Sequence, residues 1–299
     1  MNIWRLFLLF LLFNFTLLAE QIDRYDVNLT IMQSGELQIV ESIDYNFTPN
    51  TKHGIYRNIP HMNKIDGYSF DIGLLDFNIT QDDKLAEWTM DRNHNEGKET
   101  YLRIGSSLRT LTGLHRYKIT YRVHQGVVTA SANDILDAIR FDLIGTQWEV
   151  PISNINIQIH LPTSLTQQDI NLSAYTGKYR STDSQVNAHW IDKHTLQITA
   201  ERLSPYEGIT AELAYPAGKL KQTAEVLREK AKVYQQKMAV LIKEKKRKLE
   251  EHEKEVQDHI NAYDAEHLIH KGKYGHYSAN LYPINWLLEH FYLFVILFL

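Results

Sequence analysis

The sequence predicts a mainly β protein: an antiparallel β-sandwich, or two stacked β-subdomains, followed by one long α-helix and a C-terminal membrane helix. Three observations lead to this prediction. Apolar and polar residues alternate in short runs from residue 21 to about residue 216. Between residues 219 and 265 there is no glycine or proline, and apolar residues recur every three or four positions. Both ends of the chain are strongly apolar.

Composition narrows the class of protein. The 299 residues are 43% hydrophobic and 23% charged, as in a globular chain long enough for one large or two modest domains. The net charge of -4 carries no signature of nucleic-acid binding, so we expect no nucleic-acid partner. The chain contains no cysteine, which excludes disulfides, thiolate metal sites and cysteine nucleophiles.

The N-terminal residues 1–19 form the first element. Arg5 precedes an apolar run over residues 6–18, and Ala19 ends the segment. A basic start, an apolar stretch and a small residue are typical of a secretory signal peptide, with an uncleaved N-terminal anchor as the alternative. In either case the chain that follows is exported. We therefore expect a protein of the bacterial inner membrane, with residues 20–283 extracytoplasmic.

The stretch 20–216 is the predicted extracytoplasmic β domain. Every second residue over 25–31 is apolar, and the same alternation resumes over 37–47 after a turn that contains glycine. Two such runs predict an antiparallel hairpin. A short helix is expected over 131–140. Further strands are expected over 115–123, 154–162, 195–200 and 208–216.

The second strand of this hairpin carries a carboxylate in its apolar row. Glu41 lies between Ile39 and Ile43 on the face that we expect to point into the core. A buried unpaired charge is costly, so Glu41 needs a partner. Arg57, in the stretch HGIYR, is the nearest basic residue along the chain that can return beside it, and a guanidinium matches a carboxylate. We hypothesise that Glu41 and Arg57 form a buried, bidentate ion pair.

His53 and Gly54 begin the stretch HGIYR and form its expected turn. A glycine there permits a tight entry or a β-bulge where a side chain would clash. The alternative interpretation is a polar catalytic centre of His53, Arg57 and Glu41. The sequence has no GxSxG elbow, HExxH motif or phosphate-binding loop to accompany such a centre. We favour the structural pair and expect no catalytic residues and no cofactor.

The stretch 219–265 predicts one charged, coiled-coil-like helix of about 40–45 residues. Its apolar stripe has steps of three and four residues and then of seven, at Ile242, Leu249, Val256 and Tyr263. Charged residues interrupt the stripe, which predicts a weak seam. The basic run KEKKRK fits a solvated helix face. An anionic membrane surface or an acidic helix of a protein partner is the functional alternative.

A linker, residues 266–283, leads to the last apolar segment, 284–299. Its sixteen residues at about 1.5 Å each reach about 24 Å, less than the ~30 Å of a hydrocarbon core. We expect a transmembrane segment, either a tail anchor or a span in which the chain stops part-way, with an interfacial helix as the alternative. We expect no metal site, because chance explains a histidine cluster here in a chain with 14 histidines; the cluster is His267, His270 and His276.

Five separated segments of the chain carry a resemblance to a known family: 35–47, 53–60, 113–123, 145–152 and 203–216. In this order they resemble the N-terminal domain of a bacterial family of predicted membrane proteins, catalogued as domain of unknown function 2207. The resemblance implies an envelope protein with a signal peptide, an extracytoplasmic β-rich domain, a membrane span and often a cytoplasmic remainder with further spans. It supplies no catalytic residues that can be assigned to positions of this chain. The long charged helix and the lack of a cytoplasmic remainder depart from the family pattern.

These observations favour an interaction protein over an enzyme. The expected role is binding of a protein partner or a ligand by an exported β domain that is tethered to the membrane on a helical stalk. The helix over 219–265 is the expected contact for a protein partner. The alternative is an envelope enzyme acting on glycan or peptide through His53, Arg57 and Glu41. A deep pocket that opens these groups to water would favour the enzyme, and a pair sealed under aromatic side chains would count against it.

Overall fold

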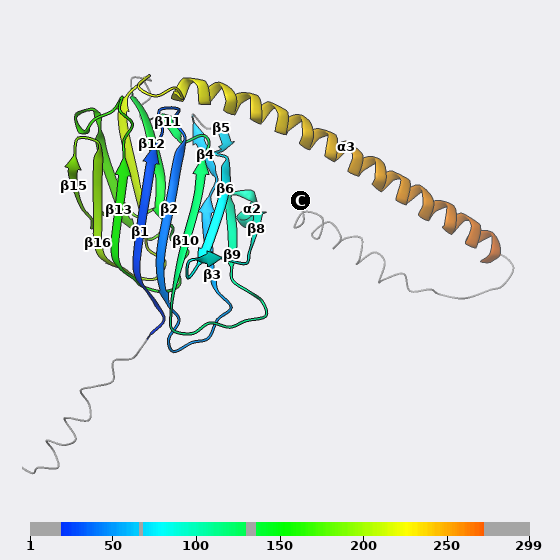
Figure 1. The fold of residues 1–299 in the computed structure, drawn as a ribbon. Coiled ribbons are helices and arrows are strands. Elements are labelled where there is room, and N and C mark those ends of the chain that lie inside the picture. The colour runs from blue at the N-terminus through cyan, green and yellow to red at the C-terminus, as the bar shows by residue number, and fades with distance from the viewer. Residues whose placement is uncertain (1–18, 66–67, 130–135, 272–299) are drawn as a thin grey trace, which may run out of the picture. The chain divides into compact units, whose positions relative to one another are not determined.

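The computed structural model describes residues 19–65, 68–129 and 136–271. Within these ranges the chain is mainly strand, with one long helix near its C-terminal end (Figure 1). The chain divides into two compact units, the first ending at Gln236 and the second beginning at Lys237. Residues 1–18 of the predicted signal segment and the whole of the predicted C-terminal membrane segment lie outside the described residues. Among the helices that are described, none is long and apolar enough to cross a membrane.

The largest sheet has eight strands, in the order β15-β16-β13-β1-β2-β10-β6-β7. Alternation explains its two faces: in β1 the side chains of Tyr25, Val27 and Leu29 are buried, and that of Asn28 is exposed. β1 and β2 form the predicted antiparallel hairpin. The strands are β1 (Gln21–Ile31), β2 (Leu37–Asn46), β6 (Leu74–Gln81), β7 (Lys84–Leu85), β10 (Leu114–Val123), β13 (Ile152–His160), β15 (Asn187–Asp192) and β16 (Thr195–Leu203).

One pair in this sheet is parallel, which corrects the prediction of a wholly antiparallel fold. β1 and β13 run in the same direction, with Val27 beside Ile157. Alternation shows which face of a strand is buried, but residues i and i+2 share a face whatever the direction of the neighbouring strand. The sheet is therefore mixed.

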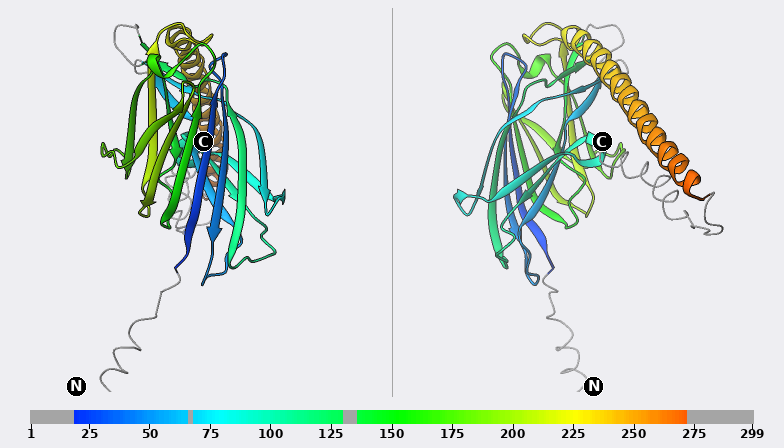
Figure 2. Two further views of the ribbon diagram at one scale, coloured as in Figure 1. Left: turned by 60° about the vertical axis from the view of Figure 1, so that its left-hand side comes forward. Right: turned by 90° about the vertical axis from the view of Figure 1, so that its right-hand side faces the viewer.

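Three smaller sheets complete the β domain. In Figure 2 their strands form a second layer across from β1 and β2. One hydrophobic cluster includes side chains of both layers, such as Ile157, Leu213 and Leu102, so the layers share a core. The sheets are β11 (Val127–Thr129), β12 (Leu136–Ile144), β17 (Gly208–Pro216) and β14 (Asn171–Gly177); β3 (Ile55–Pro60), β9 (Glu99–Ile104) and β8 (Trp88–Asn93); and β4 (Met62–Ile65) and β5 (Tyr68–Asp71).

The structure corrects the short helix expected over 131–140. Residues 136–140 belong to β12, and residues 130–135 lie outside the described part of the chain. β12 pairs on one side with β11 and on the other with β17. Hydrogen bonds to two neighbouring strands outweigh the local preference of this stretch for a helix. Two short helical turns lie elsewhere, α2 (His94–Gly97) and η1 (Gln167–Asp169).

The prediction of a long helix is confirmed by α3, Ala224–Lys271, which has 48 residues. It begins later than predicted because the segment before it is bound to the β domain, where the N–H groups of Lys221 and Gln222 donate to carbonyls of the β1–β2 turn. Leu227 and Ala231 in its first turns are buried. Most of the described side chains beyond them are exposed.

Candidate functional site

A buried polar cluster lies where Glu41 of β2 meets Arg57 of β3. The guanidinium donates from Nε to Oε2 and from Nη2 to Oε1, both at 2.8 Å. The hydroxyl of Tyr25 donates to Oε2 at 2.6 Å, and that of Tyr121 donates to Oε1 at 2.8 Å. Each carboxylate oxygen therefore accepts two hydrogen bonds. The structure brings together the two residues that the sequence singled out as a pair.

This cluster is closed to water, since Glu41 is 0% exposed and Arg57 is 2% exposed. Burial raises the pKa of the Glu41 carboxyl, but the charge of Arg57 and the three donating side chains outweigh burial and hold that pKa below its usual range. Burial also lowers the pKa of Arg57, and the Glu41 carboxylate more than reverses this. Burial raises the pKa of Tyr25 and Tyr121 well above the usual value. At neutral pH Glu41 and Arg57 therefore stay charged, and Tyr25 and Tyr121 keep their hydroxyl protons. Groups that do not change protonation near neutral pH suit a structural role better than proton transfer.

His53 lies apart from this cluster, on an exposed loop. Its Nδ1 is 2.9 Å from the carbonyl oxygen of Arg109 and 3.1 Å from that of Ser106. Because carbonyl oxygens only accept, Nδ1 carries the hydrogen that is donated to them. Within the described residues no hydrogen bond joins His53 to Glu41 or Arg57. The structure therefore does not assemble the alternative catalytic centre.

Gly54 enters β3 through a close contact with Gly105. Their φ angles of +146° and +137° lie in a region that favours glycine. A Cβ on Gly54 would lie 1.9 Å from the carbonyl oxygen of Ile104, and a Cβ on Gly105 would lie 2.0 Å from that of His53. Both positions therefore require glycine. The sequence pointed to a tight entry at Gly54 but not to Gly105, because only the pairing of β3 with β9 brings the two together.

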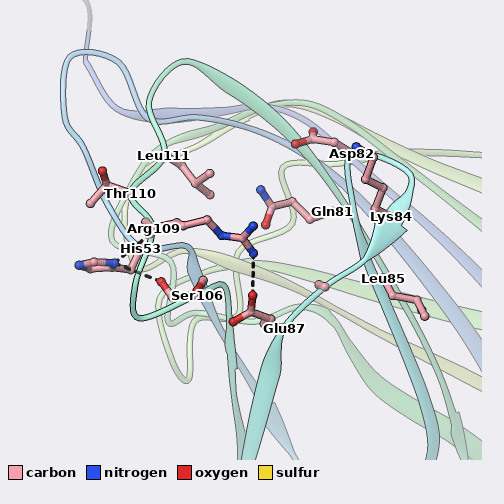
Figure 3. Close-up of a pocket in the computed structure, with 11 residues that line it drawn as sticks. His53, Gln81, Asp82, Lys84, Leu85, Glu87, Ser106, Arg109, Thr110 and Leu111 are labelled. Carbon is pink, nitrogen blue, oxygen red and sulfur yellow. Dashed lines mark hydrogen bonds and ion pairs between the residues drawn. The ribbon is translucent and has the colours of Figure 1, made fainter.

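An open cleft of about 570 Å³ lies between the β6–β7 hairpin and the loop after β9 (Figure 3). Arg109 and Glu87 form an ion pair there at 2.6 Å. The imidazole of His53 points its Nδ1 toward the loop and its other nitrogen away from Glu87 (Figure 3). Charges of both signs line this space, which we call the charged cleft. Its lining residues are His53, Gln81, Asp82, Lys84, Leu85, Ala86, Glu87, Ser106, Arg109, Thr110 and Leu111.

A second hollow, of about 410 Å³, adjoins the charged cleft and shares His53 and Ser106 with it. Lys52, His53 and Arg103 line this hollow, and none of its lining residues is acidic. Lys52 pairs with Glu20 at 2.8 Å. Within the described residues the guanidinium of Arg103 forms no hydrogen bond or ion pair. We call this space, lined by residues 51–56 and 103–107, the basic hollow.

The basic hollow carries the donors that bind an anion. The guanidinium of Arg103 and the ammonium of Lys52 supply charge-assisted hydrogen bonds. Four hydroxyl groups lie among these cations, those of Thr51, Tyr56, Ser106 and Ser107. Sequence reasoning missed this site because its two halves are far apart along the chain and neither half has a recognisable binding motif.

Metal ligands do not gather in the described part of the chain, where no group of three or more histidine, aspartate or glutamate side chains could hold an ion. The side chains of His267 and His270 lie outside the described residues, and so does His276.

Residues 21–215 match the model of a family described as "Predicted membrane protein (DUF2207) N-terminal domain". The match spans the β domain and stops before α3. No curated protein sequence matches the chain.

Solved structures resemble the chain only distantly. Native leukotriene A4 hydrolase from Saccharomyces cerevisiae is 10% identical, with a TM-score of 0.37 over 64% of this chain and 29% of that one. An M1 zinc metallopeptidase from Deinococcus radiodurans is 12% identical, with a TM-score of 0.36 over 64% of this chain and 42% of that one. The chain thus spans less than half the length of these enzymes, and a likeness this weak carries no functional argument.

Proposed function

The chain belongs to the DUF2207 family of predicted membrane proteins, and from this premise we propose that it is a membrane-anchored cell-envelope protein whose exported β domain binds an anionic ligand in the basic hollow. The observation that carries the binding role is the lining of Lys52, His53 and Arg103 without any acidic residue. The guanidinium of Arg103, the ammonium of Lys52 and four hydroxyl groups offer more donors than the two oxygens of one carboxylate can accept. We therefore assign the hollow a phosphate-bearing ligand.

The protein resides in the bacterial inner membrane, with residues 20–283 extracytoplasmic. Two features of the sequence support this placement, the signal-like segment 1–19 and the apolar segment 284–299, which acts as the transmembrane anchor. Membership of a family of predicted membrane proteins supports it as well.

The helix α3 serves as a stalk and as a coiled-coil-like contact for a protein partner. At about 1.5 Å per residue, its 48 residues extend about 72 Å. Its first turns are held against the β domain by Leu227 and Ala231, which are buried. Farther along, exposed apolar side chains such as Ile242 and Leu249 support a contact with another helix.

The alternative function, an envelope enzyme acting on glycan or peptide, has less support. Its polar centre would need His53, Arg57 and Glu41 together in a space that substrate can enter. Arg57 and Glu41 are instead buried beneath Tyr25 and Tyr121, while His53 is exposed. A general acid or base must reach the substrate within hydrogen-bond distance, directly or through one water. The sealed pair offers no such access.

Phosphate binding by the full chain in detergent tests the proposal. We expect polyphosphate to bind the natural protein and Arg103→Gln to weaken binding about tenfold, because one charge-assisted contact is lost. Arg180→Gln is the matched control, since it removes an arginine that lines neither the basic hollow nor the charged cleft. This control should leave binding unchanged.

Vesicles form the second arm of this experiment. Binding to phosphatidylglycerol vesicles but not to phosphatidylcholine vesicles, with the same dependence on Arg103, would identify a lipid headgroup as the source of the phosphate. If neither probe binds, or if the Arg103 and Arg180 variants lose equal affinity, the basic hollow is not a phosphate site.

A further inference from the structure

The exposed part of α3 carries an apolar stripe. Four of its members are seven residues apart, which is the spacing of a coiled-coil seam. A helix whose stripe stays in water gains little stability from burial, so the pattern predicts a partner that covers it. The exposed apolar residues of the stripe are Met238, Ile242, Leu249, Val256 and Tyr263.

Charges on the same stretch are separated into two blocks. Residues 243–248 contain five basic residues and one acidic residue, whereas residues 250–258 contain five acidic residues and one basic residue. Some of these charges form pairs within the helix, such as Arg247 with Glu251. Such exposed pairs contribute little stability. Both blocks therefore remain available to a partner with the opposite order of charge.

We propose that the partner of this stripe is the same stretch of α3 in a second copy of the chain, in antiparallel orientation. Turning one helix end for end about a point near residue 250 places the basic block of each copy opposite the acidic block of the other. At about 100° per residue, Lys248 and Glu255 lie on one flank of the stripe, and Lys246 and Glu253 lie on the other. In an antiparallel pair each flank faces the same flank of the second copy, so each of these lysines faces a glutamate.

A parallel pair is less favourable. It would place Lys245 beside Lys245 of the second copy within the seam, and His252 beside His252. Like charges at close range oppose such a pairing.

The seam is weak because Lys245 and His252 interrupt its apolar residues. Pairing therefore depends on a high effective concentration, which two copies anchored in one bilayer provide when their paired helices lie along the membrane surface. In this respect the inference rests on the proposed membrane anchoring, and it does not depend on the basic hollow.

Distances between spin labels on the full chain, reconstituted in lipid vesicles, test the orientation. The natural chain has no cysteine, so Val240→Cys and Lys254→Cys each carry a single label, on the side of the helix away from the stripe. An antiparallel pair centred near residue 250 predicts separations along the helix axis of about 10 Å for the label at 254 and about 32 Å for the label at 240. Equal separations at the two sites would show a parallel pair, and no dipolar coupling at either site would show no self-pairing. Either result overturns the proposal.

Two further readings complete the test. Flotation of the same samples shows whether the chain stays with the lipid. A loss of membrane anchoring is thereby distinguished from a loss of pairing between anchored chains. Lys246→Glu with Lys248→Glu should abolish the coupling between labels, and the addition of Glu253→Lys with Glu255→Lys should restore it. Coupling that survives the first change, or that the second change fails to restore, would overturn the register set by charge.

Discussion

Two arginine–glutamate pairs in this domain differ mainly in their access to water. Arg57 and Glu41 are 2.8 Å apart, with side chains 2% and 0% exposed. Arg109 and Glu87 are 2.6 Å apart, with side chains 73% and 59% exposed. The distances alone would rank the outer pair as the stronger. Loss of one partner leaves an uncompensated charge in the core in the first case and a hydrated charge in the second. Burial, and not contact distance, therefore decides which pair the fold depends on.

The largest expected effect comes from opening the inner pair. Arg57→Met leaves the Glu41 carboxylate buried without its cation, and we expect the free energy of unfolding to fall by about 3–5 kcal/mol. Denaturant titration followed by tryptophan fluorescence measures this change. The double variant Glu41→Leu with Arg57→Met removes both charges and should cost less than the sum of the two single changes. A loss in Arg57→Met no larger than that of a surface substitution would show that the pair does not hold β3 on β2.

Removing one hydroxyl donor from the inner cluster should have a smaller effect. Tyr121→Phe deletes the hydrogen bond to Oε1 of Glu41, and we expect a loss of about 2 kcal/mol because the acceptor is charged and buried. Tyr117 provides the matched control, since it is buried on the same strand and its hydroxyl has no hydrogen-bond partner in the described part of the chain. Tyr117→Phe should therefore leave the unfolding midpoint unchanged or raise it. Equal losses in the two variants would remove the role assigned to Tyr121.

Acidification tests the same cluster without changing its shape. The folded-state pKa of Glu41 lies below its usual value of 4.5, so the unfolded chain binds the proton more readily than the folded chain does. The stability that this group contributes is present above about pH 4.5 and is lost as the pH falls through the folded-state pKa. We expect the unfolding free energy of Glu41→Gln to fall less steeply with acid than that of the natural protein. Parallel slopes in denaturant titrations below pH 4.5 would contradict this assignment.

The inner cluster was more accessible to sequence reasoning than the outer site. Glu41 stood out because a charge in an apolar row is costly without a partner, and Arg57 follows close enough along the chain to supply a guanidinium that matches it. Alternation places Tyr25 and Tyr121 on the buried faces of their strands, but it gives no hydrogen-bond partner for either hydroxyl. The basic hollow depends on the pairing of Ile55 with Ile104, which brings residues 51–56 beside 103–107. Long-range pairing of this kind, like the parallel contact of β1 with β13, is not encoded in the local alternation of either strand.

The smallest effect is expected from the outer pair. Arg109→Met removes the cation but leaves Glu87 in water, where hydration replaces most of the lost attraction, and the free energy of unfolding should change by no more than about 0.5–1 kcal/mol. Added salt should reduce even this difference, whereas it should leave the much larger effect of Arg57→Met nearly unchanged, because ions screen exposed charges and do not enter the core. Denaturant titrations of both variants at low and high salt measure the contrast. If Arg109→Met matched the loss in Arg57→Met, the outer loop would be part of the cooperative core.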